Sequence, residues 1–167
     1  MAGSYELYFI RHAIAEKRGE AWPDDNKRPL SADGIARMRK NAKGLVKMGV
    51  TLDLVLTSPL VRARQTAEVV AAAFDARPSI VAIDSLSPGS SYQSLLNDLA
   101  KHSRRTRIAL VGHETTLGEH AARLCGSRHA FPFKKGGVCR IDLEVLPPAG
   151  PGTLRWFATP GMLRRIR

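Results

Sequence analysis

The chain has 167 residues, of which 44% are hydrophobic and 25% charged, a balance typical of a folded domain with a real core. This composition excludes a disordered tail. The formal net charge of +11 is typical either of a nucleic-acid binder or of a protein that favours anionic substrates, and we interpret most of the basic residues as a solvated surface. The basic residues are dispersed and do not alternate with aromatic residues as in a base-stacking surface, so we do not expect nucleic acid to bind.

Hydropathy and cysteine content further narrow the class of protein. No stretch reaches the length of a membrane span, and the N-terminal residues lack a basic region followed by an apolar signal core. We therefore expect a soluble cytoplasmic protein that does not associate with membranes. The two cysteines, Cys125 and Cys139, lack metal-ligand spacing and are too few for a disulfide scaffold, so we interpret them as ordinary thiols.

The first strand signal is the apolar run 7–10, which stops at two adjacent side chains, Arg11 and His12. A buried parallel strand delivers such residues to the carboxyl edge of its sheet, where open α/β sheets place their ligands. Residues 14–30 are polar and irregular, and predict a loop long enough to fold over that edge. Apolar residues at helical spacing then predict a helix within 31–49, with Ser31 as its cap and Gly49 at its end.

A second strand is predicted over 52–57, and Ser58 followed by Pro59 predicts the start of a helix, with the serine as its cap. This places Arg62 in or beside the first helical turn. There its guanidinium lies near free backbone N–H groups and the positive end of the helix dipole, a combination that favours phosphate. An ion pair with Glu68 or another neighbouring acid is an equally good interpretation.

The second half of the chain continues the alternation of strand and helix signals. The run 106–111 predicts a buried strand followed by Gly112 and His113, and Thr116 with Glu119 predicts a capping box at the next helix. The other predicted elements are strands over 79–83, 138–145 and 153–158 and a helix that ends near residue 102. The alternation indicates an α/β fold in which the last two strands form an antiparallel or mixed edge.

Four side chains thus follow the ends of three predicted strands: Arg11, His12, Arg62 and His113. If these strands are parallel, the four side chains meet at one crevice around an anion-sized space. Two guanidinium groups match the oxygens of a phosphoryl group, and a neutral imidazole between them can attack phosphorus. The second imidazole can donate a hydrogen bond to the equatorial oxygens. The predicted chemistry is two-step hydrolysis through a covalent phosphohistidine.

Two other residues are candidates for lining this crevice. Arg28 could reach it from the long loop, although an ion pair with Asp24 or Asp25 is slightly favoured. Glu114 could orient a substrate or a water molecule, and a surface carboxylate is an equally good interpretation.

The motifs at the three strand ends resemble those of the histidine phosphatase superfamily, whose fold is phosphoglycerate mutase-like. The resemblance rests on residues 11–13 (Arg-His-Ala), 58–67 (Ser-Pro-Leu-Val-Arg-Ala-Arg-Gln-Thr-Ala) and 111–113 (Val-Gly-His). It implies a three-layer α/β/α fold with a central, mostly parallel sheet of about six strands. We expect one such domain over residues 1–167. The resemblance also implies an enzyme that uses no metal or other cofactor.

The resemblance assigns a role to each of the four side chains. His12 is the nucleophile, Arg11 and Arg62 bind phosphate, and His113 binds phosphate and stabilises the transition state. Ala13 stands where many members have glycine, which changes loop freedom but removes no catalytic group.

Within the superfamily, the short chain and the segments 28–34 and 86–89 are similar to the compact SixA-type phosphohistidine phosphatases. Larger phosphomonoesterases and mutases typically carry a glutamate between the second and third motifs. Here Asp84 is the nearest carboxylate and has no clear match to that glutamate.

The lack of a clear general acid favours a substrate with a good leaving group. An alkoxide must be protonated as it leaves, whereas imidazole, with a conjugate-acid pKa of roughly 6.5, departs more easily. The expected substrate is therefore N-phosphohistidine on a protein. A broader phosphatase acting on small phosphorylated molecules is the alternative, and a catalytically inactive nucleic-acid-binding module is a remote one. Proton donation by Asp84, Glu16 or Glu114 to an alkyl leaving group would overturn the preference.

Overall fold

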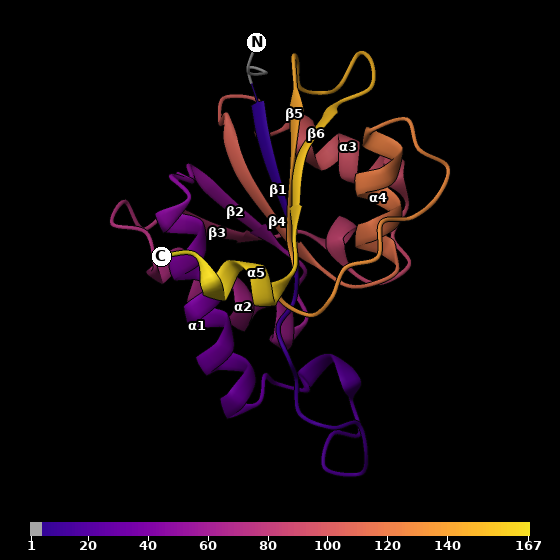
Figure 1. Cartoon of the computed structure of the whole chain (residues 1–167). Coiled ribbons are helices and arrows are strands. Elements are labelled where there is room, and N and C mark those ends of the chain that lie inside the picture. Colours follow the sequence, from indigo (N-terminus) through magenta and orange to yellow (C-terminus); the bar gives the residue numbers. More distant parts are fainter. Residues whose placement is uncertain (1–4) are drawn as a thin grey trace.

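A computed structural model describes residues 5–167, which form a six-stranded sheet with helices between the strands (Figure 1). Residues 1–4, which the domain prediction includes, lie outside the described residues. The strands are β1 (Tyr5–Arg11), β2 (Leu54–Thr57), β3 (Ser79–Ala82), β4 (Arg107–Gly112), β5 (Val138–Leu143) and β6 (Thr153–Ala158). Their order in the sheet is β3-β2-β4-β1-β5-β6.

The first four strands are parallel to one another, and the last two form an antiparallel edge. β1 pairs with β4, β4 with β2, and β2 with β3, all in parallel register. β5 runs antiparallel to β1, and β6 antiparallel to β5. The predicted mixed sheet is therefore confirmed, and the carboxyl ends of β1, β2 and β4 lie at the same edge.

Helices cover both faces of this sheet. α1, α2 and α5 pack on one face and α3 and α4 on the other, which confirms the three-layer α/β/α arrangement (Figure 1). The helices are α1 (Ala32–Lys47), α2 (Val61–Ala72), α3 (Tyr92–Ala100), α4 (Thr116–Leu124) and α5 (Pro160–Arg165), with short 3-10 turns η1 (Asp25–Lys27) and η2 (Asp84–Leu86).

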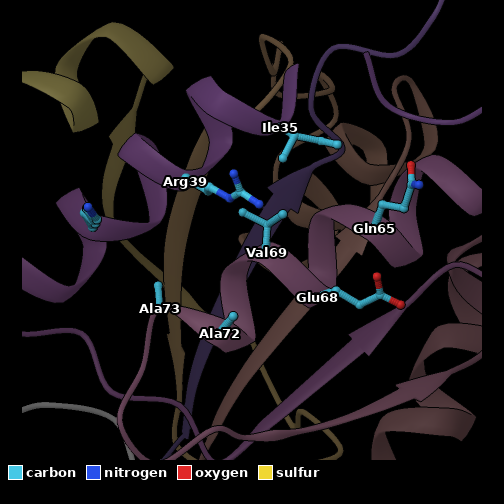
Figure 2. A pocket seen from close by; sticks show the side chains of 8 residues that line it. Ile35, Arg39, Gln65, Glu68, Val69, Ala72 and Ala73 are labelled. Carbon is cyan, nitrogen blue, oxygen red and sulfur yellow. The ribbon is translucent and has the colours of Figure 1, made fainter. Parts of the chain in front are cut away.

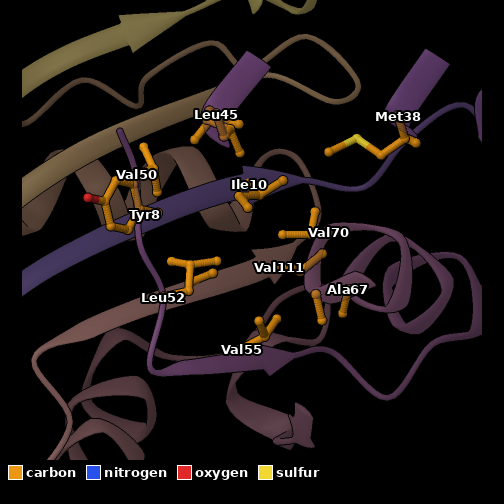
Figure 3. Close-up of a cluster of buried hydrophobic side chains, with 14 of the residues drawn as sticks. Tyr8, Ile10, Met38, Leu45, Val50, Leu52, Val55, Ala67, Val70 and Val111 are labelled. Carbon is orange, nitrogen blue, oxygen red and sulfur yellow. The ribbon is translucent and has the colours of Figure 1, made fainter. Parts of the chain in front are cut away.

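The alternation of side chains along β1 divides the core into two halves. Tyr8 and Ile10 belong to the cluster under α1 and α2, which Figure 3 shows together with Val111 of β4. Leu7 and Phe9 point to the opposite face and pack under α3 and α4. All four are fully buried, which explains why this strand is a continuous apolar run in the sequence.

Two predicted helix starts are wrong, and in both cases the capping side chain binds elsewhere. α2 has Leu60 as its N-cap, and the Oγ of Ser58 instead accepts from the Leu60 N–H and contacts His113. α4 has Thr115 as its N-cap, and the Oγ1 of Thr116 accepts from the N–H of Gly89 at 2.8 Å. Both side chains hold a neighbouring segment at the carboxyl edge of the sheet.

Other predicted bounds differ at element ends. The cap at Ser31 is confirmed, since its Oγ accepts from the N–H of Gly34 at 3.0 Å. The second and fifth strands are shorter than expected, at 54–57 and 138–143, and α5 was not predicted. Six residues that include Pro160 and Gly161 carry too little periodicity to indicate a helix.

Candidate active site

The carboxyl ends of β1, β2 and β4 bring His12, Ser58 and His113 together. Backbone hydrogen bonds continue the sheet past the strand ends, since the His12 N–H donates to the Gly112 carbonyl and the Ser58 N–H to the Val111 carbonyl. As a result the His12 and His113 rings lie with centroids 5.1 Å apart. The predicted convergence of these strand ends is therefore confirmed.

A cavity of about 520 Å³ opens at this edge, and its walls include the four predicted residues Arg11, His12, Arg62 and His113. Arg28 and Glu114, the two candidate lining residues, also belong to its walls. The long loop adds Glu16, Lys17 and Arg18. The six residues selected from the sequence therefore border one space.

The hydrogen bond of the His12 side chain fixes its tautomer. Its Nδ1 lies 2.7 Å from the backbone carbonyl of Ala13, and a carbonyl oxygen can only accept. We therefore assign the ring proton to Nδ1, which leaves the Nε2 lone pair available for attack. His12 is 7% exposed, so the ring is held in this orientation within a nearly closed environment.

His113 has the opposite arrangement, with its Nε2 bound 2.8 Å from the Ser58 Oγ. The Ser58 hydroxyl can donate its proton to His113 Nε2 while its oxygen accepts from the Leu60 N–H, an arrangement that places the ring proton at Nδ1. We assign the His113 ring proton to Nδ1 on this basis. A proton at Nδ1 can be donated to an oxygen of a bound phosphoryl group.

Both imidazoles are neutral near pH 7. Burial lowers the pKa of His12 to about 3, and His113, Arg62 and Arg11 add repulsion that acts in the same direction. Burial lowers the pKa of His113 to about 4, again with Arg62 and Arg11 nearby. The environment thus keeps His12 unprotonated and nucleophilic.

These lowered pKa values predict a loss of stability in acid. In the unfolded chain, histidine becomes protonated near pH 6.5. In the folded chain, His12 and His113 become protonated only at about pH 4 or below. Between these limits only the unfolded chain binds the proton, so the free energy of unfolding falls by up to about 1.4 kcal/mol per histidine for each pH unit of acidification. Urea unfolding at about pH 7 and about pH 5 should show this loss reduced in His12→Asn/His113→Asn. An unchanged pH dependence in that variant would contradict the assignment.

Arg62 is 4% exposed and meets the long loop through Asp25. Its Nη1 donates to the Asp25 carbonyl at 2.8 Å, and its Nη2 lies 3.3 Å from the Asp25 carboxylate. Of the two interpretations of Arg62, the ion pair with a neighbouring acid holds with Asp25 and not with Glu68, and Arg62 lines the pocket as well. The ion pair therefore orients the guanidinium at the pocket wall.

Asp25 also binds Arg28, whose Nε lies 2.8 Å from the carboxylate. The Nη1 of Arg28 donates to the Glu16 carbonyl at 2.8 Å, so this side chain closes the base of the long loop. Arg28 consequently satisfies both sequence interpretations, because it pairs with Asp25 and lines the cavity.

Arg11 and Glu114 are held by the same backbone unit. Arg11 Nη1 donates to the Phe133 carbonyl at 2.7 Å, and the Phe133 N–H donates to the Glu114 carboxylate at 2.6 Å. Glu114 is half-buried and so is not merely a surface carboxylate. Its other oxygen, Oε1, lies close to Gly118 of α4, so the carboxylate is packed between the Phe133 N–H and that helix at the cavity wall.

Three buried nitrogen atoms of residues that line this cavity have no hydrogen-bond partner within residues 5–167: Arg11 Nε, Arg62 Nε and His113 Nδ1. An unpaired buried donor costs about 1–3 kcal/mol. A phosphoryl group offers acceptor oxygens to donors of this kind. The chemistry of this donor set therefore suits an anionic group such as a phosphoryl group.

Ser58 and Asp25 are the functional candidates that sequence reasoning missed. The sequence pattern favours Ser58 as a helix cap, although its place directly after a strand, as for His12 and His113, is a usable signal for a site residue. Asp25 appeared only as a partner for Arg28. Its contact with Arg62 spans 37 residues, and no local pattern indicates it.

Removing the Ser58 hydroxyl should slow catalysis by about tenfold, because His113 loses the bond that fixes its ring and tautomer. The measurement is kcat for Ser58→Ala beside Ser85→Ala, a matched variant that deletes another buried serine hydroxyl, bonded to Asp98. Equal kcat values in the two variants would show that Ser58 does not position His113.

Another cavity, of about 620 Å³, lies between α1 and α2 (Figure 2). Ile35 and Arg39 of α1 face Gln65, Glu68 and Val69 of α2 across it. None of the six candidate site residues lines this groove.

Within residues 5–167, no group of three or more His, Cys, Asp or Glu side chains is placed to share a metal ion. No helix in that range is long and apolar enough to span a bilayer.

Comparison with known proteins agrees with this geometry. The family model described as histidine phosphatase superfamily (branch 1) matches residues 7–86, which include Arg11, His12 and Arg62. An uncharacterised protein of Picosynechococcus is 37% identical over 137 residues, covering 80% of this chain and 82% of the relative. The chain belongs to the histidine phosphatase superfamily.

Within the superfamily, SixA-type members are similar to nearly the whole chain. The phosphohistidine phosphatase SixA of Escherichia coli is 26% identical over 168 residues, covering 97% of this chain and 98% of the relative. A solved structure of SixA with tungstate has a TM-score of 0.83 at 24% identity, over 93% of this chain and 97% of that one. A phosphoserine phosphatase of Entamoeba histolytica shares the fold with a TM-score of 0.69 at 18% identity, over 95% and 99%.

Proposed function

We propose that this histidine phosphatase superfamily member hydrolyses N-phosphohistidine on a protein, through a covalent phosphohistidine on His12 and without a metal. The observation that carries the proposal is the bond from His12 Nδ1 to the Ala13 carbonyl, which leaves Nε2 unprotonated inside a pocket walled by Arg11 and Arg62. We also propose that residues 1–167 act as one catalytic domain.

In the first step, the Nε2 lone pair of His12 attacks phosphorus and the P–N bond of the substrate breaks. The substrate imidazole leaves as a neutral ring when its other nitrogen carries a proton, so the enzyme need not supply one. Arg11 and Arg62 bind the equatorial oxygens, and His113 Nδ1–H donates to one of them.

In the second step, a water molecule attacks phosphorus from the side that the substrate imidazole has left. The P–Nε2 bond breaks, its electron pair returns to His12, and the proton lost by water passes to the departing phosphate or to solvent. Inorganic phosphate is released, and His12 regains the tautomer that the Ala13 carbonyl selects. The guanidinium groups supply positive charge in both steps.

The carboxylates near the pocket also bear on the choice of substrate. Asp84 is exposed and lies outside the cavity walls. Glu16 is exposed, and one oxygen of Glu114 accepts from the Phe133 N–H. This distribution supports a substrate whose leaving group needs no strong general acid.

Glu114 favours a second candidate function, a broader phosphatase for small phosphomonoesters. It lines the catalytic cavity from the residue next to His113 and, unlike Glu16, it is half-buried, so its carboxyl group is the candidate for protonating an alkoxide. In that case Glu114→Gln would lose activity on alkyl phosphates selectively.

The test is phosphate release in the presence of a chelator, from a phosphohistidine protein and from matched alkyl phosphates. The proposal predicts rapid release from phosphohistidine that depends on His12 and persists in Glu114→Gln. Comparable or faster release from alkyl phosphates, lost in Glu114→Gln, would support the broader phosphatase. No release from any substrate would overturn both.

A further inference from the structure

A second cavity, of about 490 Å³, adjoins the catalytic pocket on the side of α1 and α5. The two cavities share Arg11, Ile14 and Lys135 in their walls, so they lie on either side of a ridge formed by these residues. We call this second cavity the side groove. Its apolar wall atoms come from residues that include Ile14, Met38 and Pro160.

The side groove is strongly basic. Five cationic side chains line it, and no carboxylate does so within residues 5–167. They are Arg11, Arg37, Lys134, Lys135 and Arg164. Arg37 is partly neutralised by Asp33, 2.8 Å away, whereas Lys134 and Lys135 form no ion pair with any described residue. The groove therefore combines apolar side chains with uncompensated positive charge.

The turn that carries the two lysines is fastened to the catalytic strand. The Gly136 N–H donates to the carbonyls of Arg11 and His12, at 3.1 and 3.2 Å, and the Gly137 N–H donates to the Lys134 carbonyl at 2.8 Å. Gly136 has φ +80, and a Cβ there would lie 2.7 Å from the Asn41 amide nitrogen. The turn thus has a fixed position relative to His12.

Asn41 links this turn to the far wall of the groove. It is 2% exposed, its Nδ2 donates to the Gly136 carbonyl at 3.3 Å, and its Oδ1 accepts from Arg164 Nη1 at 3.2 Å. The Arg164 charge is oriented by a neutral partner and stays available to an anion. Lysine and arginine charges are therefore held together in the walls of one groove that adjoins the pocket of His12.

We propose that the side groove docks an acidic segment of the phosphoprotein substrate, with an apolar side chain of that segment seated on the half-buried Ile14 and Pro160. The inference rests on the proposed function for its substrate class. Two observations select this occupant: the positive charge of the groove complements an acidic segment, and the groove adjoins the catalytic pocket. When the phosphohistidine is in the pocket, the residues that flank it in the substrate lie beside the pocket, where the side groove can bind them. The overall charge of +11 would speed encounter with such a partner.

The test compares two synthetic peptides with a central phosphohistidine and one leucine, flanked by glutamates in one peptide and glutamines in the other. Free phosphoramidate serves as the small substrate. We expect the wild-type kcat/KM to be about tenfold higher for the glutamate peptide, and this preference to vanish between about 50 mM and about 500 mM salt. Lys134→Glu/Arg164→Glu should abolish the preference and lower kcat/KM far more for that peptide than for phosphoramidate.

The matched control is Arg104→Glu/Arg105→Glu, which makes the same change of charge before β4, at the opposite end of the sheet. It should keep the preference. Equal wild-type rates for the two peptides, or equal losses in both double variants, would overturn the docking site.

Binding of the unphosphorylated peptides, labelled for fluorescence anisotropy, separates docking from catalysis. Tighter binding of the glutamate peptide, lost in Lys134→Glu/Arg164→Glu, supports the docking site even if no phosphohistidine is hydrolysed and the proposed function fails. Equal binding of the two peptides overturns it. A single-stranded oligonucleotide that binds the groove more tightly than the glutamate peptide would also overturn it and assign the charge to nucleic acid.

Discussion

Replacing His12 by alanine is expected to reduce turnover of every phosphorylated substrate by about 10⁴-fold or more. The variant has no nitrogen at the position of attack. Arg11 and Arg62 can still bind the phosphoryl group, but they supply no nucleophile to accept it. Steady-state phosphate release measures the loss, and equilibrium unfolding shows whether the variant is folded. Because the His12 ring is neutral near pH 7, its removal leaves no unpaired buried charge, and we expect the variant to fold there with reduced stability from the small cavity.

His129→Ala is the matched control for this variant, since His129 is exposed and is not among the residues that line the cavity of His12. It should retain full turnover. A folded His12→Ala that keeps more than about one hundredth of the wild-type kcat would mean that water attacks phosphorus directly, with no enzyme nucleophile.

Replacing Arg62 by lysine should lower kcat/KM by about 10²-fold or more, although the charge is kept. A lysine has no planar fork, so it cannot bind two phosphoryl oxygens and the Asp25 carbonyl in the geometry that Arg62 uses. Its ammonium would also be buried where Arg62 is 4% exposed. The measurement is kcat/KM for phosphohistidine together with the inhibition constant of inorganic phosphate.

Arg64→Lys is the control for Arg62→Lys, because Arg64 lies two residues further along α2 and is exposed. Its kcat/KM should match that of the wild type. Asp25→Asn extends the test, since it removes the charge opposite Arg62 but keeps the carbonyl contact, and we expect a smaller loss, of about tenfold. Wild-type kcat/KM in Arg62→Lys would show that this side chain only supports the loop.

The site could be predicted where local sequence determines position. A run buried on both faces, such as 7–10, must be a central strand, and parallel strands end at one edge, so Arg11, His12 and His113 converge. Arg62 follows because its helix begins at that same edge. The same reasoning gave the sheet and its antiparallel border.

The remainder depends on contacts between distant segments. A serine or threonine before a helical pattern serves equally as a cap or as a partner for another segment, and Ser58 and Thr116 do the latter. The ion pair of Asp25 with Arg62 and the side groove walls arise only when the loop, α1, α5 and the 134–137 turn are assembled. Only the folded chain brings these residues together.

Capture of the phosphoenzyme tests the central claim most directly. Wild-type protein mixed with a phosphohistidine substrate and quenched within milliseconds under alkaline conditions should carry one phosphoryl group, which mass spectrometry places on the His12 side chain. Its rates of formation and decay should account for kcat, and His12→Ala should show none. Turnover at the full rate with no phosphoenzyme, or with the phosphoryl group on His113, would contradict the account.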